Sequence, residues 1–127
     1  MKRFMKILVA YDGSALADKA LDEAVDLAEM SEGSIAVIHV PWEESDDESR
    51  RLLARAEARL KKAGARYELM SERSQYPPRR IIRAAMDGGF DLICVGSRGL
   101  GASKAWVLGS VSSRVIEEAP CPVLVVK

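Results

Sequence analysis

The chain has 127 residues, of which 48% are hydrophobic and 30% are charged, a balance typical of an ordinary globular protein. Its 19 basic and 19 acidic residues cancel, so no strong field attracts nucleic acid or an anionic membrane surface. No apolar run approaches the ~20 residues that span a bilayer. The length predicts one domain over 1–127, and two isolated cysteines in apolar surroundings favour a reducing, cytoplasmic location.

The first half of the chain alternates short apolar runs with amphipathic stretches. Apolar runs of strand length cover 5–11 and 34–40. Between them, small and apolar residues recur at the three-four spacing of a helix face over 15–31, and Gly33 is expected to close that helix. A capping-box pattern at 45–48 then starts a second helix, which Gly64 ends.

The second half continues the alternation. Charged and apolar residues alternate over 66–71, which predicts a half-exposed strand at a sheet edge. Pro77 and Pro78 start a short helix that Gly88-Gly89 ends, and further elements follow as strand 91–95, helix 110–118 and strand 123–126. Strict alternation with near-continuous apolar strands predicts an α/β fold, a parallel sheet with helices on both faces.

The connection after strand 91–95 is long and rich in glycine. It runs from Gly96 to Gly109, about fourteen residues where such connections usually take ~2–6. Glycines allow a ligand to approach backbone amides, and the start of the next helix favours an anion. The hydroxyl groups of Ser110 and Ser112 add donors. The loop therefore has the features of a phosphate-binding cradle.

Two common phosphate-binding motifs do not fit this loop. Ala102 stands where a Walker A motif needs lysine, which argues against a P-loop NTPase. Lys104 stands where the dinucleotide fingerprint needs its third glycine, which argues against a nicotinamide dehydrogenase.

The spacing Gly96-x2-Gly99-x9-Gly109-Ser110 instead resembles the ATP-binding signature of the universal stress protein family. Three further segments resemble that family in the same order along the chain. They are Tyr11-Asp12-Gly13-Ser14 after the first strand, Val37-Ile38-His39-Val40 at the end of the second, and the stretch 119–126.

The resemblance implies a five-stranded parallel sheet of order 3-2-1-4-5, whose switch point lies between strands 1 and 4. It also implies ATP as the ligand, with Mg²⁺ or Mn²⁺ accompanying the triphosphate. In members similar to this chain, the acidic residue after strand 1 contacts the nucleoside, the ends of strands 1 and 2 lie near adenine, and the glycine loop surrounds ribose and phosphates. The predicted binding residues are Ala10, Tyr11, Asp12, Val40, Gly96, Arg98, Gly99, Gly109, Ser110, Val111 and Ser112.

Structural explanations compete with these assignments. Asp12 is also a natural cap for the turn before the first helix, and Arg98 is either a solvated loop charge or a phosphate partner. His39 closes a buried strand, which favours a packed, hydrogen-bonded histidine over a general base. Cys94 is expected in the core. No catalytic residue and no protein metal ligand is assigned.

The resulting hypothesis is an ATP-binding stress-response or regulatory protein that acts on an unidentified protein partner. Two alternatives stay open: a slow ATP or nucleotide hydrolase, and a nucleotide-free interaction module. The family resemblance places strand 123–126 at a sheet edge, where its four apolar residues need cover. We therefore expect a homodimer through that strand, as in similar members of the family.

Overall fold

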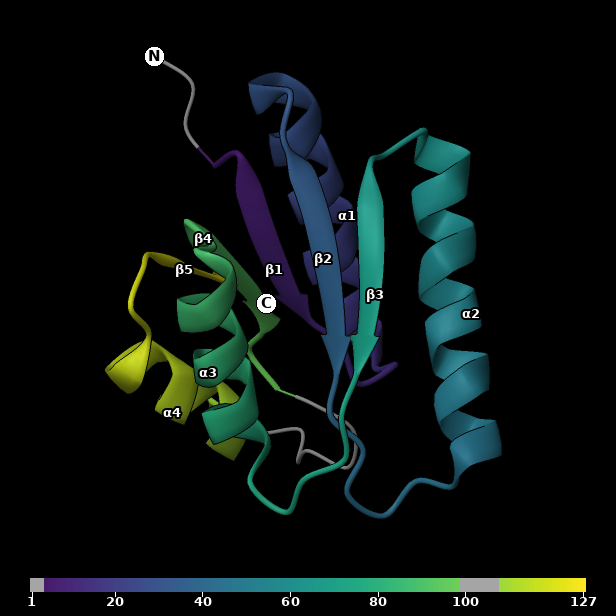
Figure 1. The fold of residues 1–127 in the computed structure, drawn as a ribbon, viewed down its shortest axis with the longest axis vertical. Helices are drawn as coiled ribbons and strands as arrows, with labels where there is room; N and C mark the ends of the chain where they lie inside the picture. Colours follow the sequence, from purple (N-terminus) through teal and green to yellow (C-terminus); the bar gives the residue numbers. More distant parts are fainter. Residues whose placement is uncertain (1–3, 99–107) are drawn as a thin grey trace.

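Five parallel strands form a single sheet of order β3-β2-β1-β4-β5 (Figure 1). The structure is a computed structural model and describes residues 4–98 and 108–127. This order confirms the predicted topology. The strands are β1 (Lys6–Ala10), β2 (Ser34–His39), β3 (Tyr67–Ser71), β4 (Leu92–Gly96) and β5 (Val123–Val126).

Helices cover both faces of the sheet (Figure 1). One face packs against α1 and α2, and the other packs against α3 and α4. Among the described residues, none of the helices is long and apolar enough to cross a membrane. The helices are α1 (Ala15–Ser31), α2 (Asp46–Ala63), α3 (Pro77–Gly88) and α4 (Ser110–Glu118).

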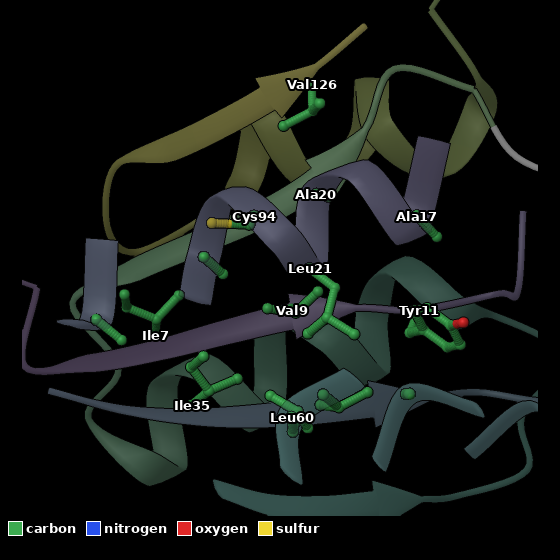
Figure 2. Close-up of a cluster of buried hydrophobic side chains, with 14 of the residues drawn as sticks. Ile7, Val9, Tyr11, Ala17, Ala20, Leu21, Ile35, Leu60, Cys94 and Val126 are labelled. Atoms are coloured by element: carbon green, nitrogen blue, oxygen red, sulfur yellow. The ribbon is translucent and has the colours of Figure 1, made fainter. Parts of the chain in front are cut away.

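The two faces of the sheet hold two separate apolar cores because successive strand residues point to opposite sides. Along β1, Ile7 and Val9 join the α1 and α2 core, whereas Leu8 joins the α3 and α4 core. Figure 2 shows the first core, in which Leu21 and Leu60 pack from the helices onto the strands. Both faces are therefore buried, which explains the near-continuous apolar strands of the sequence.

Cys94 belongs to the core, as the sequence predicted. It is fully buried in β4 beneath α1 (Figure 2). Burial raises the pKa of its thiol to about 12, with a smaller contribution from the charge of Glu23. The thiol therefore stays protonated at neutral pH and packs as an apolar group.

The strand register brings the carboxyl ends of the central strands to one level. Ala10 at the end of β1 is paired with Ile38 of β2, and Val9 is paired with Cys94 of β4. The segments that follow these three strands therefore emerge side by side. At the far edge, β3 is the half-exposed edge strand that the charged and apolar alternation predicted.

One helix end differs from the prediction. The left-handed residue that caps α1 is Glu32, with φ of 57°, and not Gly33. Gly33 is required for space, because a Cβ there would lie 2.6 Å from the carbonyl oxygen of Phe4. The glycine therefore permits close approach of the chain before β1.

Candidate functional site

A cavity of about 430 Å³ opens at the carboxyl ends of β1, β2 and β4. In the sheet order, β1 and β4 are neighbours from which the chain winds outward in opposite directions. Open α/β sheets bind ligands at this switch point, and the volume falls within the ~300–1,000 Å³ of small-molecule sites. The N-terminal part of α4 and two residues of α3 complete the walls.

Every predicted binding residue that the structure describes lines this one cavity. The set comes from three distant stretches of sequence, which the parallel sheet brings together. Gly99 lies outside the described residues. The lining includes Ala10, Tyr11, Asp12, Val40, Gly96, Arg98, Gly109, Ser110, Val111 and Ser112.

The turn between β1 and α1 fixes the orientation of Asp12. Its Oδ1 accepts a hydrogen bond of 2.9 Å from the amide of Ser14, and Ser14 Oγ in turn accepts one of 3.1 Å from the amide of Ala17. Between them, Gly13 has φ of 83°, and a side chain there would collide with Leu52. Asp12 thus both supports the turn and lines the cavity, so the two explanations of this residue are compatible.

Tyr11 makes all of its polar contacts within the protein. Its hydroxyl donates to Asp18 at 2.5 Å, its amide donates to Ile38 at 2.9 Å, and its carbonyl accepts from His39 at 3.0 Å. The ring lies in the core beneath α1 (Figure 2), with the Arg55 guanidinium 5.9 Å from its centroid. The Tyr11 hydroxyl is therefore engaged with Asp18, while the residue lines the cavity.

The environment of Tyr11 favours the neutral phenol. Burial is the largest cause that raises its pKa to about 12, and the hydrogen bond to Asp18 and the charge of that carboxylate add to it. The Arg55 guanidinium lowers the pKa of Tyr11, but its effect is smaller than the combined effects of burial and Asp18. The phenol is thus a hydrogen-bond donor throughout the physiological pH range.

His39 links the site to α2 and is packed as the sequence predicted. Its side chain is 1% exposed, with Nδ1 3.0 Å from the Tyr11 carbonyl oxygen and Nε2 3.1 Å from Ser49 Oγ. Because a carbonyl only accepts, Nδ1 carries the proton, and in the neutral ring Nε2 accepts from the Ser49 hydroxyl. The imidazole therefore positions the end of β1.

The start of α4 forms the end of the cavity that suits an anion. Gly109 is the N-cap and provides no side-chain cap to the first-turn amides. Its amide donates to the Ser97 carbonyl at 2.7 Å, which ties this helix start to the segment after β4. Exposed first-turn amides and the helix dipole favour negative charge, and Arg98 lines the same cavity.

The two serines of α4 differ in their contacts. Ser110 is exposed, and its hydroxyl has no bond to any described residue. Ser112 is buried, and its hydroxyl donates to the Gly96 carbonyl at 2.5 Å. The Ser112 hydroxyl thus connects α4 to β4, and the prediction that both hydroxyl groups donate to phosphate stays a prediction.

Gly96 has a packing role that the sequence did not reveal. A Cβ at this position would lie 2.9 Å from the Leu16 Cβ and 3.0 Å from its carbonyl carbon. The absence of a side chain thus lets the end of β4 approach α1 closely. The glycine at position 96 is therefore required by the contact between β4 and α1, independently of any ligand.

The segment after β2 supplies cavity residues that motif analysis did not assign. Trp42 is 57% exposed at the cavity, and its amide donates to Glu44 Oε2 at 2.9 Å. Arg73 holds the segment by donating to the carbonyl oxygens of Trp42 at 2.9 Å and Glu44 at 2.7 Å. Further lining residues beyond the prediction are Ser14, Ala17, Ile38, His39, Pro77, Ile81 and Val95.

Glu44 is ionised at neutral pH. Partial burial alone would raise its pKa, but hydrogen bonds from the backbone amides around Trp42 and Glu44 outweigh that effect and lower the pKa below its usual value. The lining of the cavity therefore includes the acidic residues Asp12 and Glu44 together with Arg98 and the start of α4.

The model of the universal stress protein family matches residues 3–127. Universal stress protein YxiE of Bacillus subtilis is 32% identical over 148 aligned residues, which cover 98% of this chain and 99% of the relative. A crystal structure of a universal stress protein in complex with cAMP superposes with a TM-score of 0.82 at 26% identity, covering 98% of each chain. The universal stress protein from Archaeoglobus fulgidus in complex with dAMP superposes with a TM-score of 0.80 at 27% identity, again covering 98% of each.

The family match extends over nearly the whole chain, and so does the alignment with the Bacillus relative. This chain therefore belongs to the universal stress protein family, which confirms the resemblance found in the sequence.

Proposed function

We propose that this universal stress protein binds ATP in the cavity at the ends of β1 and β4. The observation that carries the proposal is the gathering of Asp12, Arg98 and the uncapped start of α4 around one cavity at the switch point of the sheet. Two solved relatives hold adenine nucleotides, cAMP and dAMP, which supports the same ligand class here.

The chemistry of the lining fits the parts of a nucleotide. Ala10 and Val40 provide apolar surface for adenine, and Asp12 provides acceptors for ribose hydroxyl groups. Gly96 and Gly99 are proposed to approach ribose and phosphates. The phosphates would receive hydrogen bonds from the start of α4, which comprises Gly109, Ser110, Val111 and Ser112. In our proposal Arg98 also pairs with the phosphates. Mg²⁺ or Mn²⁺ would arrive on the triphosphate and neutralise part of its charge.

The physiological role that we propose is nucleotide-dependent regulation in the cytoplasm during stress. In this role the protein acts as a homodimer through β5 and presents a surface to a protein partner. The edge position of β5 supports the dimer, since its exposed backbone groups and apolar side chains would gain partners.

Isothermal titration calorimetry with ATP tests the binding site. Gly109 has φ of −68° and ψ of 161°, which any residue adopts, so Gly109→Val should keep the fold by circular dichroism. The branched side chain should abolish ATP binding because it occupies the space where backbone meets phosphate. Unchanged affinity in this variant would contradict the phosphate assignment.

A serine pair on α4 provides a matched comparison. Ser110→Ala should weaken ATP binding by roughly 1–2 kcal/mol, the scale of one hydrogen bond to a charged group. Ser113 lies on the same helix but does not line the cavity, so Ser113→Ala should bind ATP as the unmodified protein does. Equal effects of the two substitutions would indicate a general effect on α4.

Mass spectrometry of nucleotides released from gently purified protein tests the identity of the ligand. We expect ATP. Release of AMP alone would contradict the triphosphate part of the proposal while leaving the site intact. Protein that carries no nucleotide and binds none in the calorimeter would favour the nucleotide-free interaction module.

A further inference from the structure

A groove of about 300 Å³ runs between α3 and α4 on a different face of these helices from the nucleotide cavity. Arg79 and Arg83 of α3 and Arg114 of α4 line its sides. Tyr76, Ile82 and Met86 contribute the apolar part of the lining. The two helices lie beside each other on one face of the sheet, as Figure 1 shows.

The groove is a continuous helix face rather than a chance collection of side chains. On α3 the residues at positions 79, 82, 83 and 86 follow the i, i+3, i+4, i+7 spacing of one helix face. Two large apolar side chains on this face are unusually accessible, since Tyr76 is 65% exposed and Met86 is 61% exposed. An accessible apolar strip flanked by charge is typical of an interaction surface.

The positive charge of the groove is largely uncompensated. Within residues 4–98 and 108–127, neither Arg79 nor Arg83 has a carboxylate partner, and the Arg79 guanidinium lies 5.7 Å from the Tyr76 ring centroid. Arg114 reaches Glu118 only at 3.7 Å, and both side chains are more than half exposed. Glu118 also lines the groove, and three arginines against this one glutamate leave the groove a net positive charge.

We propose that this groove binds an acidic, amphipathic helical segment of a partner protein. Aspartate and glutamate side chains of the segment would pair with Arg79, Arg83 and Arg114, and its apolar residues would cover Ile82 and Met86. A groove between two helices accepts a third helix through such spaced anchors. The proposal makes no use of a bound nucleotide, because the groove and the cavity share no lining residue.

The composition of the groove favours a protein over other polyanions. Arginine, tyrosine and methionine are enriched at protein interfaces, whereas lysine is depleted there. The described lining holds three arginines, one tyrosine, one methionine, one isoleucine, one proline and one glutamate, and it contains no lysine. A second copy of this chain is disfavoured, because twofold symmetry would bring the arginines of one groove against those of the other.

Selection from a displayed library of helix-forming peptides of about 20 residues tests the proposal, since shorter helices are marginal in water. We expect enriched peptides to combine acidic residues with leucine or aromatic residues at helical spacing. In fluorescence anisotropy with the synthetic peptides, Arg83→Glu and Arg114→Glu should each weaken binding about tenfold or more. Met86→Ser should also weaken it.

Arg51→Glu provides the matched control, because Arg51 is an exposed arginine of α2 outside the groove. This variant should bind the peptides like the unmodified protein. Arg83→Gln removes the charge without reversing it and should give an intermediate loss. All substituted arginines are exposed, so circular dichroism should show an unchanged fold.

Two results would overturn the proposal. The first is a selection in which every enriched peptide binds Arg83→Glu and Arg114→Glu as tightly as it binds the unmodified protein, or in which no peptide is enriched. The second is binding of a single-stranded oligonucleotide or of phosphatidylserine vesicles that is lost in Arg83→Glu while no peptide binds, which would assign the groove to a different polyanion. Neither result would contradict the proposal that the protein binds ATP, so this test is independent of the proposed nucleotide function.

Discussion

At the scale of single residues, glycines in this protein serve several purposes. Gly96 lets the end of β4 approach the backbone of α1, and Gly13 adopts a left-handed conformation in the turn that holds Asp12. Gly109 has no such conformational requirement, since its backbone angles suit any residue. A glycine that its backbone conformation does not require is a good candidate for contact with a ligand.

The Tyr11 phenol provides a prediction on pH. Its pKa rises from 10.0 to about 12 on folding, so its contribution to stability is complete below pH 10 and is lost as the pH rises toward 12. Over that interval this group alone should lower the free energy of unfolding by ~1.4 kcal/mol per pH unit. Urea denaturation at several alkaline pH values measures this loss of stability. Tyr11→Phe is the reference, because it lacks the phenol that titrates.

The difference between the two proteins is the informative quantity, because other groups titrate equally in both. The stability of the unmodified protein should fall relative to Tyr11→Phe above pH 10. Parallel curves for the two proteins would contradict the buried hydrogen bond from Tyr11 to Asp18.

At the scale of elements, His39 connects three of them. It lies at the end of β2, contacts the carbonyl at the end of β1 and reaches Ser49 in α2. Ser49 is 6% exposed, so Ser49→Ala would leave the buried Nε2 of His39 without its partner. We predict a loss of about 1–3 kcal/mol in the free energy of unfolding, measured by urea denaturation. Ser71→Ala, at an exposed position of β3, should change it little.

A loss of stability for Ser71→Ala equal to that for Ser49→Ala would contradict the account of His39.

The sequence predicted that His39 is packed, because it ends a buried strand. It did not predict Ser49 as the partner, since α2 is a separate element and only the packing of the fold determines which of its residues faces β2.

The elements themselves were predictable because strand and helix periodicities differ and turn residues separate them. The capping serine of α2 is one example, since Ser45 Oγ accepts from the Glu48 amide at 3.1 Å. The end of α1 was less predictable: Glu32 takes the left-handed position beside Gly33, whose own requirement comes from the distant Phe4 backbone. Contacts between remote segments, such as Gly96 with Leu16, leave no local pattern in the sequence.

At the scale of the whole molecule, the parallel sheet explains why residues predicted from distant segments lie around one cavity. Strand order and register bring the segments after β1, β2 and β4 together, so residues assigned from separate motifs converge on one cavity. Trp42 and Glu44 were not assigned because the segment after β2 carries no motif, and Arg73 determines its position.

The edge strand β5 leads to a prediction on assembly. Pairing of β5 with a second copy would satisfy its outer backbone groups, so light scattering at micromolar concentration should give twice the chain mass of 13.9 kDa. Val125→Lys should weaken the dimer, because the charge would face the apolar contact or the neighbouring helix layer, against which Val125 packs. Glu68→Lys, on the opposite edge strand β3, should leave it intact. A monomer mass for the unmodified protein would refute the dimer.

The most direct test of the nucleotide site is a titration with ATP followed by ¹H–¹⁵N NMR spectra of the unmodified protein. We predict that the amide signals of Asp12, Ser110, Val111 and Ser112 shift progressively and saturate, because these residues line one cavity. Amides of β3, at the far edge of the sheet, should not move. Spectra that stay unchanged at millimolar ATP, or shifts confined to residues outside the cavity, would contradict the account.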